Sequence, residues 1–388
     1  MKVLYLVNDD SFFVSHRLAL GVAMKNRGFD VVVAAGESAA RSRIEDAGLR
    51  FVPVPFDRGG QSPTRDLETL GRIIALYRRE RPDLVHHVTI KPVLYGSMAA
   101  RASNVPAVVN AISGLGFVFT TSDRDRARRA ILRTGIIQGY RAALGHPNSV
   151  TIFQNEDDRL RLVDAGATTP SRSVLIRGSG VDLALFAPTP LPDPALGPPI
   201  VLLPARLLWD KGVGELVEAA RALKREGLAA RFVLSGGTSA TNPAAVRESE
   251  IRAWEREGVI EWWGHATDMP ATLARATLVA LPSFYREGLP LALAEAAAAG
   301  RPVVTTDMPG CRDALVPGET GWIVPPRDVP ALVRTLRRAL SDRAELQRRG
   351  SAGVQLAARD FDKRKIVADH LAVYDRLLRR AASPSRAS

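Results

Sequence analysis

The chain alternates short runs of aliphatic and β-branched residues with segments in which apolar residues recur at helical spacing. The runs predict strands, and the segments between them predict helices. This rhythm is typical of βαβ units that build a parallel sheet. In the first half, the predicted strands are residues 2–7, 30–35, 49–54, 83–88, 107–112 and 150–154, the predicted helices include 15–27 and 64–80, and Asn155 is expected to cap the helix after the last strand.

Six prolines interrupt the rhythm between residues 187 and 199. Proline disrupts both sheet ladders and helix interiors, so we place a domain boundary there. Alternation resumes with predicted strands at 200–204, 231–235, 278–281 and 303–305, separated by predicted helices after Lys211, near 244–257 and after Gly288. The sequence therefore predicts an α/β protein with two doubly wound, Rossmann-like parallel-sheet domains, whose binding edges lie at the carboxyl ends of the strands.

The predicted domains are residues 1–187 and 200–357. Residues 358–380 carry an apolar stripe at helical spacing, which predicts a C-terminal helix that packs back on the first domain. Residues 381–388 are small and polar and are expected to form a frayed tail. A length of 388 residues also favours two cores over one.

Composition narrows the cellular setting. Cys311 is the only cysteine, which excludes an intramolecular disulfide, and no Cys/His cluster has the spacing of a zinc site. No apolar run approaches the ~18 residues of a membrane span, and the first residues do not form a signal peptide. We expect a cytoplasmic protein that is neither exported nor integral to a membrane.

The formal net charge is +12, and arginines are densest between residues 124 and 141. Arg126, Arg128, Arg129 and Arg133 alternate there with apolar residues, as in a basic helix lying on an anionic surface. The solvated face of an ordinary packed helix has the same pattern. Both interpretations stay open.

The most informative stretch follows the predicted strand at 278–281. It begins with Pro282 and Ser283 and places two carboxylates, Glu287 and Glu295, eight positions apart. On a helix that spacing is about 12 Å of rise, similar to the separation of the sugar and the ribose in a nucleotide sugar. A diphosphate between them would lie near the helix N-terminus. Two glutamates without a role are the competing interpretation.

A second stretch, after the strand at 200–204, contains Arg206, Lys211 and Gly212. Arginine offers a planar fork to phosphate oxygens, and lysine offers a point charge. Together they would neutralise the charge that develops on a leaving diphosphate. Solvated surface cations are the alternative.

These residues as a set resemble the retaining glycosyltransferases of family 4, which have the GT-B fold of two Rossmann-like domains facing a cleft. The resemblance covers nearly the whole chain. Glycines after the second-half strands match its turns, among them Gly236, Gly237, Gly264, Gly310 and Gly318.

The resemblance implies roles for individual residues. Glu287 would contact the donor sugar, Glu295 the ribose, and Arg206 and Lys211 the diphosphate, with Glu287, Arg206 and Lys211 forming the catalytic set. It implies a retaining reaction without a metal ion, a cofactor or a protein nucleophile. Further donor-binding residues would be Gly237, Gly264, His265, Ser283, Gly288, Leu289 and Pro290.

Three positions depart from the usual family pattern. The first loop reads Asn8, Asp9, Asp10 instead of a glycine pair, Asn110 stands where a histidine is common, and Asp313 replaces a frequent glutamate. At these positions the sequence resembles a narrower group within the family. Its members are transferases that extend undecaprenyl-diphosphate-linked sugars, including one that acts on lipid-linked bacillosamine. That likeness implies a UDP-linked, N-acetylated donor, a lipid-linked acceptor at an anionic inner-membrane surface, and acceptor-binding roles for His16, Lys91, Ser113 and Gly114.

Other functions remain to be weighed. A family 4 transferase using GDP-mannose and a soluble acceptor keeps the same motifs. A UDP-sugar epimerase shares the architecture but does not need the Arg206 and Lys211 pair. A nucleic-acid-binding protein would explain the charge, yet aromatic stacking platforms are missing from the basic stretch. A nonenzymatic nucleotide-sugar-binding protein fits the four charged residues least well.

Overall fold

The computed structural model describes residues 1–56, 63–116, 126–239 and 242–383, with the backbone alone for Pro63 and residues 126–133. The chain divides into two compact units. The first comprises Met1–Ser179 and Arg364–Ser388, and the second comprises Gly180–Lys363. Within the described ranges, no helix is both long and apolar enough to cross a membrane.

The first unit is built on a seven-stranded parallel sheet with the order β3-β2-β1-β4-β5-β6-β7. Strands β4, β5 and β6 are buried along their whole length, because helices cover both faces of a parallel sheet. The strands are β1 (Lys2–Asp9), β2 (Asp30–Gly36), β3 (Arg50–Pro53), β4 (Leu84–Val88), β5 (Ala107–Ile112), β6 (Ser149–Phe153) and β7 (Ser173–Leu175).

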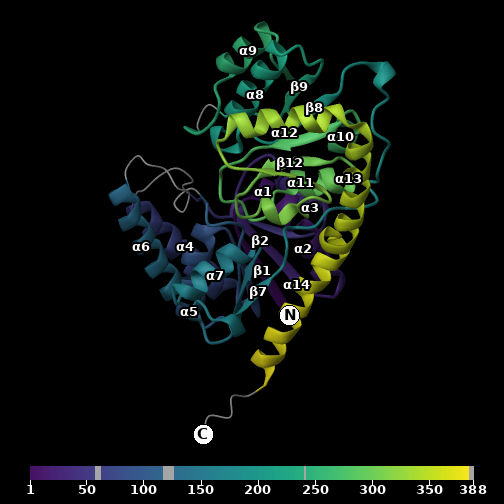
Figure 1. Cartoon of the computed structure of the whole chain (residues 1–388). Helices are drawn as coiled ribbons and strands as arrows, with labels where there is room; N and C mark the ends of the chain where they lie inside the picture. Colours follow the sequence, from purple (N-terminus) through teal and green to yellow (C-terminus); the bar gives the residue numbers. More distant parts are fainter. Residues whose placement is uncertain (57–62, 117–125, 240–241, 384–388) are drawn as a thin grey trace. The chain divides into compact units, whose positions relative to one another are not determined.

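Eight helices belong to this unit within the described residues. Helices α4, α5 and α6 pack side by side (Figure 1). Asn155 caps α7 by accepting a hydrogen bond from the Asp158 N–H group, as the sequence predicts. The helices are α1 (Asp10–His16), α2 (Leu18–Asn26), α3 (Arg41–Asp46), α4 (Pro63–Glu80), α5 (Ile90–Ala102), α6 (Arg126–Ala143), α7 (Glu156–Asp164) and α14 (Lys363–Ala382).

The predicted single helix at 15–27 is wrong, because the backbone breaks at Arg17 between α1 and α2. Arg17 is 2% exposed, and its guanidinium donates hydrogen bonds to the His16 carbonyl and to Ser179 Oγ. Two helices therefore replace one, and His16 ends α1 instead of lying at a helix start.

The C-terminal helix α14, yellow in Figure 1, completes the core of the first unit. Its residues Ile366, Val373 and Tyr374 pack in one cluster with Val3 and Tyr5 of β1. The helix runs to Ala382, slightly beyond its predicted end, and the remainder of the predicted tail, residues 384–388, lies outside the described residues.

The second unit contains a six-stranded parallel sheet with the order β10-β9-β8-β11-β12-β13. One hydrophobic cluster forms its core. The strands are β8 (Ile200–Pro204), β9 (Arg231–Ser235), β10 (Glu261–Trp262), β11 (Leu278–Leu281), β12 (Val303–Thr306) and β13 (Gly321–Val324). The helices are α8 (Val213–Arg225), α9 (Glu248–Arg256), α10 (Met269–Ala274), α11 (Leu291–Ala298), α12 (Val329–Ser341) and α13 (Arg343–Leu356).

The division between the units falls at Ser179 and Gly180, before the proline-rich stretch where the sequence places it. The Val181 N–H group bonds to the Phe361 carbonyl at 2.7 Å, and Phe186 joins the core of the second unit. The buried guanidinium of Arg301 then holds the backbone carbonyls of Thr189 and Pro190. The proline-rich segment is thus attached to the second unit.

Two parallel sheets with Rossmann-like order confirm the predicted fold class. The short edge strands β7, β10 and β13 and the helices α12 and α13 were not among the predicted elements.

Candidate active site

The order of the second sheet reverses between β8 and β11. β8 continues to β9 on one side, and β11 continues to β12 on the other. In doubly wound sheets, ligands bind outside the carboxyl ends of the strands at such a point. The loop after β8 carries Arg206 and Lys211, and the loop after β11 carries Ser283 and Glu287.

The two loops are fastened to each other. The Ser283 hydroxyl and the Phe284 N–H group each lie 3.0 Å from the Asp210 carbonyl oxygen. Gly212 has a φ of +79°, and a Cβ atom there would lie 2.2 Å from the Pro282 carbonyl oxygen. Only glycine tolerates both the left-handed backbone and this close approach.

Lys211 and Glu287 meet in an ion pair between Nζ and Oε1. Their side chains are 14% and 12% exposed, so the pair is largely removed from water. The Ser283 hydroxyl lies 3.2 Å from the same carboxylate oxygen, and the ammonium group lies 5.6 Å from the centre of the Tyr285 ring. The loops thus join two residues of the predicted catalytic set.

Glu287 does not lie on a helix, so helical rise does not set the separation of the two carboxylates. Helix α11 begins at Leu291, with Pro290 as its N-cap, and the segment before it is irregular. Gly310 packs directly beneath this segment, since a Cβ atom there would lie 2.4 Å from the Gly288 carbonyl oxygen. Asp313 holds the Gly310 turn by accepting a hydrogen bond from its N–H group at 2.9 Å.

Glu295 lies within α11 and is half-buried. Burial raises the pKa of its carboxyl group to about 7, and the nearby Lys363 charge opposes that rise. In the described part of the chain this carboxylate has no hydrogen-bond partner. It is therefore available to accept hydrogen bonds from a pair of hydroxyl groups.

Arg206 is exposed, and its guanidinium makes no hydrogen bond to any described residue. Its charge and that of Lys211 lower the pKa of Asp210, against the larger effect of burial, which raises it. Two cationic groups therefore belong to the loop that follows β8.

The predicted glycine turns lie at the same edge of the sheet. The Gly236 N–H group donates to the Gly264 carbonyl at 2.7 Å, and the Trp262 indole N–H group donates to the Gly236 carbonyl at 2.9 Å. Gly237 accepts from the Leu207 N–H group at 3.0 Å, which ties it to the β8 loop. His265 follows as an exposed residue, while Gly288, Leu289 and Pro290 are buried.

The predicted acceptor residues belong to the first unit and follow three adjacent strands, β1, β4 and β5. His16 Nδ1 lies 2.7 Å from Ser15 Oγ, and its ring stacks on Phe12 at 4.0 Å. Lys91 pairs with Asp66 at 3.0 Å. The Ser113 hydroxyl has no partner among the described residues, and Gly114 has a φ of +97°.

Sequence reasoning missed three buried polar groups near these edges. Asp210 Oδ1 is buried without a partner among the described residues, beside Lys211. Thr89, at the end of β4, has a φ of +76° and an unpartnered hydroxyl, which is rare for a β-branched residue. Cys311 is buried close to Glu287, and burial raises the pKa of its thiol to about 12. In the sequence, the only sign of these three groups is that an acidic residue, Asp210, directly precedes Lys211.

Asn110 is part of the interior of the first unit. Its Oδ1 atom lies 2.7 Å from His87 Nδ1 and accepts from the Ser97 hydroxyl at 2.9 Å. The described residues contain no group of three or more His, Cys, Asp or Glu side chains placed to hold a metal ion. In the basic stretch at 124–141, Arg124 lies outside the described residues, and the side chains of Arg126, Arg128, Arg129 and Arg133 are not described.

Comparison with known proteins gives two family matches. Residues 2–138 match the glycosyl transferase 4-like family, and residues 198–342 match the glycosyl transferases group 1 family. Among individual proteins, the chain is 24% identical to N,N'-diacetylbacillosaminyl-diphospho-undecaprenol alpha-1,3-N-acetylgalactosaminyltransferase of Campylobacter jejuni, over 98% of this chain and 100% of that protein. It is 25% identical to UDP-Gal:alpha-D-GlcNAc-diphosphoundecaprenol alpha-1,3-galactosyltransferase of Escherichia coli, over 82% of each chain.

Solved structures show the same fold. Anabaena HepE in complex with UDP matches with a TM-score of 0.76 and 19% identity, over 97% of this chain and 100% of that one. Sucrose-phosphate synthase from Thermosynechococcus elongatus matches with a TM-score of 0.78 and 20% identity, over 98% and 100%. The first half of the chain matches the glycosyl transferase 4-like family, the second half matches the group 1 family, and both halves together have the GT-B fold. The chain therefore belongs to the glycosyltransferases.

Proposed function

We propose that this glycosyltransferase moves an N-acetylated hexose from a UDP-sugar to an undecaprenyl-diphosphate-linked saccharide during the assembly of a surface polysaccharide or glycan. The names of the Campylobacter and Escherichia relatives, which cover most of this chain, support the acceptor class. UDP in the HepE structures and in the name of the Escherichia relative supports the nucleotide. The N-acetyl group rests on the Campylobacter relative.

The Lys211–Glu287 pair is the observation that carries this proposal. A diphosphate placed beside the pair would share the Lys211 ammonium and gain the exposed Arg206 guanidinium as a second cation. Both would stabilise negative charge as the glycosidic bond breaks. Glu287 would then turn its acceptor oxygens to the donor sugar.

Glu295 would hold the ribose, because a carboxylate can accept hydrogen bonds from two neighbouring hydroxyl groups. With a pKa of about 7, about half of this carboxyl group is ionised at neutral pH. We propose that the reaction retains the configuration of the sugar and needs no metal ion. In that scheme the leaving phosphate itself assists removal of the proton from the acceptor hydroxyl.

His16, Lys91, Ser113 and Gly114 are the proposed acceptor residues. Lys91 would exchange its contact with Asp66 for the acceptor diphosphate, since one ammonium group can serve either anion. We further propose that the enzyme associates with the cytoplasmic face of an anionic membrane. Its net charge of +12 supports this, because each well-placed Lys or Arg contributes about 1 kcal/mol at such a surface.

Thermal unfolding with a nucleotide panel tests the donor site. A ligand that binds the native state alone raises its apparent stability. UDP and one UDP-sugar should raise the melting temperature, while GDP, GDP-mannose and ADP should not. The shift should disappear in Glu295→Ala and Lys211→Ala and persist in Glu226→Ala, which removes an exposed carboxylate paired with Arg337 in the same unit. A rise in melting temperature with GDP-mannose alone would instead favour a family 4 transferase that uses GDP-mannose and a soluble acceptor.

Two further assays address the remaining parts of the proposal. Transfer measured with excess EDTA should be unchanged, and the anomeric configuration of the product should match that of the donor. Co-sedimentation with vesicles should be stronger for phosphatidylglycerol than for phosphatidylcholine. Equal sedimentation with both lipids would remove the membrane proposal and leave the donor site untouched.

A further inference from the structure

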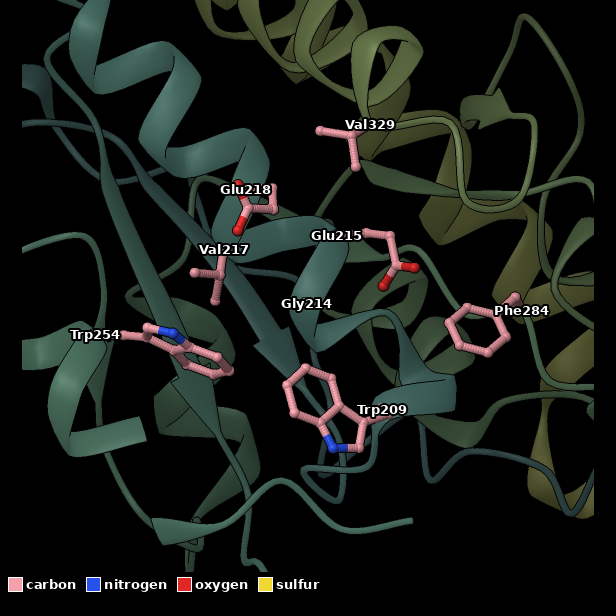
Figure 2. Close-up of a pocket in the computed structure, with 8 residues that line it drawn as sticks. All are labelled: Trp209, Gly214, Glu215, Val217, Glu218, Trp254, Phe284 and Val329. Atoms are coloured by element: carbon pink, nitrogen blue, oxygen red, sulfur yellow. The ribbon is translucent and has the colours of Figure 1, made fainter. Parts of the chain in front are cut away.

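A pocket of about 360 Å³ opens in the second unit beside the two loops described above. Trp209, Glu215, Trp254 and Phe284 contribute most of its functional groups, and Gly214, Val217, Glu218 and Val329 complete the lining (Figure 2). None of the residues proposed to bind the donor lines it. The pocket thus shares the two loops with the proposed donor site but none of its proposed donor residues, so the transfer reaction does not account for its lining.

Aromatic rings form two sides of this pocket. In Figure 2 the Trp254 indole lies on the left, the Phe284 ring on the right, and the Trp209 indole below and between them. The indole centroids are 6.0 Å apart, and their planes meet at 83°. Trp209 is 38% exposed, and Gly214 leaves room for its indole, because a Cβ atom there would lie 3.2 Å from the ring.

Perpendicular rings present one face and one edge to a ligand. A flat nucleobase is held best between parallel aromatic faces, which this pair does not offer. A thick, puckered ring with an apolar face can rest on one indole while the second indole closes its side. Within the described part of the chain neither indole N–H group is engaged in a hydrogen bond, so both can donate to a ligand.

Two carboxylates, Glu215 and Glu218, line the pocket, and arginines outside the lining offset their charge. Glu218 pairs with Arg221 at 2.5 Å. Arg327 lies 4.2 Å from the centre of the Phe284 ring, and its charge opposes the rise that burial causes in the pKa of Glu215. A free anion would be repelled by the two lining carboxylates, and a free cation would meet carboxylates whose charge Arg221 and Arg327 already offset. The pocket therefore favours a neutral ligand whose hydroxyl groups donate to carboxylate oxygens.

From these observations we propose that the pocket is a second carbohydrate site, which binds a neutral pyranose by its apolar face on the indoles and by its hydroxyl groups at Glu215. The volume is at the small end of the range of about 300–1,000 Å³ for ligand pockets, which suits a mono- or disaccharide. The Phe284 N–H···O=C bond to Asp210 links its wall to the loops of Lys211 and Glu287.

Binding to the full-length protein tests the site, with saturation-transfer NMR and calorimetry as readouts. Methyl α-D-glucopyranoside, N-acetylglucosamine and maltose are the neutral probes, and tetramethylammonium, glucuronate and uridine are the comparison ligands. We expect at least one neutral saccharide to bind, and the affinity to fall at least tenfold in Trp254→Ala and in Glu215→Gln. Glu226→Gln, the matched surface control, should bind as the wild type does.

The same titration in Glu287→Gln separates this pocket from the donor site, because saccharide binding should persist there. Each variant is first shown to be folded by its unfolding transition, and the conservative Glu215→Gln keeps the test decisive if Trp254→Ala does not fold. No binding of any neutral probe, undiminished binding in Glu215→Gln, or a preference for tetramethylammonium would overturn the proposal. Saccharide binding without any response to UDP would count against the proposed transfer function alone.

Discussion

Lys211 and Glu287 come from loops after different strands and form an ion pair at the point where the strand order of the second sheet reverses. Each residue would be costly to leave alone there, because an unpaired charge in a partly buried site loses hydration without compensation. The pair also brings the cation of one motif to the carboxylate of the other. Their contributions to folding and to catalysis should therefore be coupled.

We expect Lys211→Met and Glu287→Gln each to reduce kcat by about 10²–10³-fold, since in the proposed site each supplies an electrostatic contact to the reacting groups. The double variant should be far less impaired than the product of the two effects, because the residues act as a unit. Urea unfolding should show the same coupling, with the double variant losing less stability than the sum of the single losses. Additive effects in both measurements would mean that the pair has no joint role.

Glu295 should make donor binding depend on pH. Its pKa is about 7, and only the ionised carboxylate accepts hydrogen bonds through both oxygens. The dissociation constant of a UDP-sugar should therefore decrease as the pH rises from about 6 to about 8. A UDP-sugar is the proper probe, because its diphosphate has no second ionisation near neutrality. In Glu295→Gln the pH dependence should vanish, and a dependence that survives would assign it to another group.

The raised pKa of Glu295 also affects folding: stability should decrease with rising pH, whereas donor affinity should increase. A carboxyl group whose folded pKa lies above its unfolded value binds more protons in the folded state. Its contribution to stability is present below the unfolded value of 4.5 and is lost as the pH rises through about 7. Comparing wild type with Glu295→Gln across that window should show the wild type losing relative stability.

Gly310→Ala should displace the segment that holds Glu287. The new Cβ atom would lie 2.4 Å from the Gly288 carbonyl oxygen and 2.6 Å from that of Glu287. Gly318 is a matched control, because it has the same φ of +81° but no atom within 4 Å of the added carbon. Gly318→Ala should cost about 1–2 kcal/mol of stability through backbone strain alone and keep kcat. Gly310→Ala should lose more stability and also lower kcat, and equal behaviour of the two variants would contradict this account.

Acid should unfold the first unit before the second. Burial lowers the pKa of His87 to about 4 and that of His370 to about 3, and it lowers the pKa of His86 well below its usual range. The unfolded chain takes up these protons below about pH 6.5, so stability should fall by about 1.4 kcal/mol per pH unit for each such histidine. The second unit has a single histidine, the exposed His265.

Two readouts distinguish the units. All five tryptophans belong to the second unit, so tryptophan fluorescence follows that unit, while hydrogen exchange follows the strands of the first. On lowering the pH, protection of β1 and β4 should be lost while the fluorescence is still native. His370→Gln should reduce the slope for the first unit, and simultaneous loss of both signals would show that another group controls acid unfolding.

The long buried strands were predictable because their apolar runs report burial on both faces of a parallel sheet. The edge strands β7, β10 and β13 were not, since β10 has two residues and β7 has three, and their pairing depends on a neighbour that is distant in sequence. Arg17, where the helix breaks, likewise contacts Ser179, which is 162 positions away in sequence. Local patterns do not encode such contacts.

For the candidate site, the sequence could predict which residues follow β8 and β11, because motif positions relative to strands are local information. It does not predict that Lys211 and Glu287 contact each other, since each motif by itself indicates a side chain that reaches toward a ligand. The estimate of the carboxylate separation also applies helical rise to the whole interval from Glu287 to Glu295, although the helix begins only after Pro290. The orientation of side chains at a sheet edge depends on both loops at once.

Helix α14 supplies part of the core of the first unit, yet it is translated after the whole of the second unit. During synthesis, the apolar face formed by Val3, Tyr5 and Val7 therefore stays uncovered by α14 until the ribosome has passed residue 363. The second unit is continuous in sequence and can acquire its native core earlier. The half of the enzyme that is made first is thus finished last, and a nascent chain interrupted before α14 presents an unfinished hydrophobic surface to chaperones and proteases.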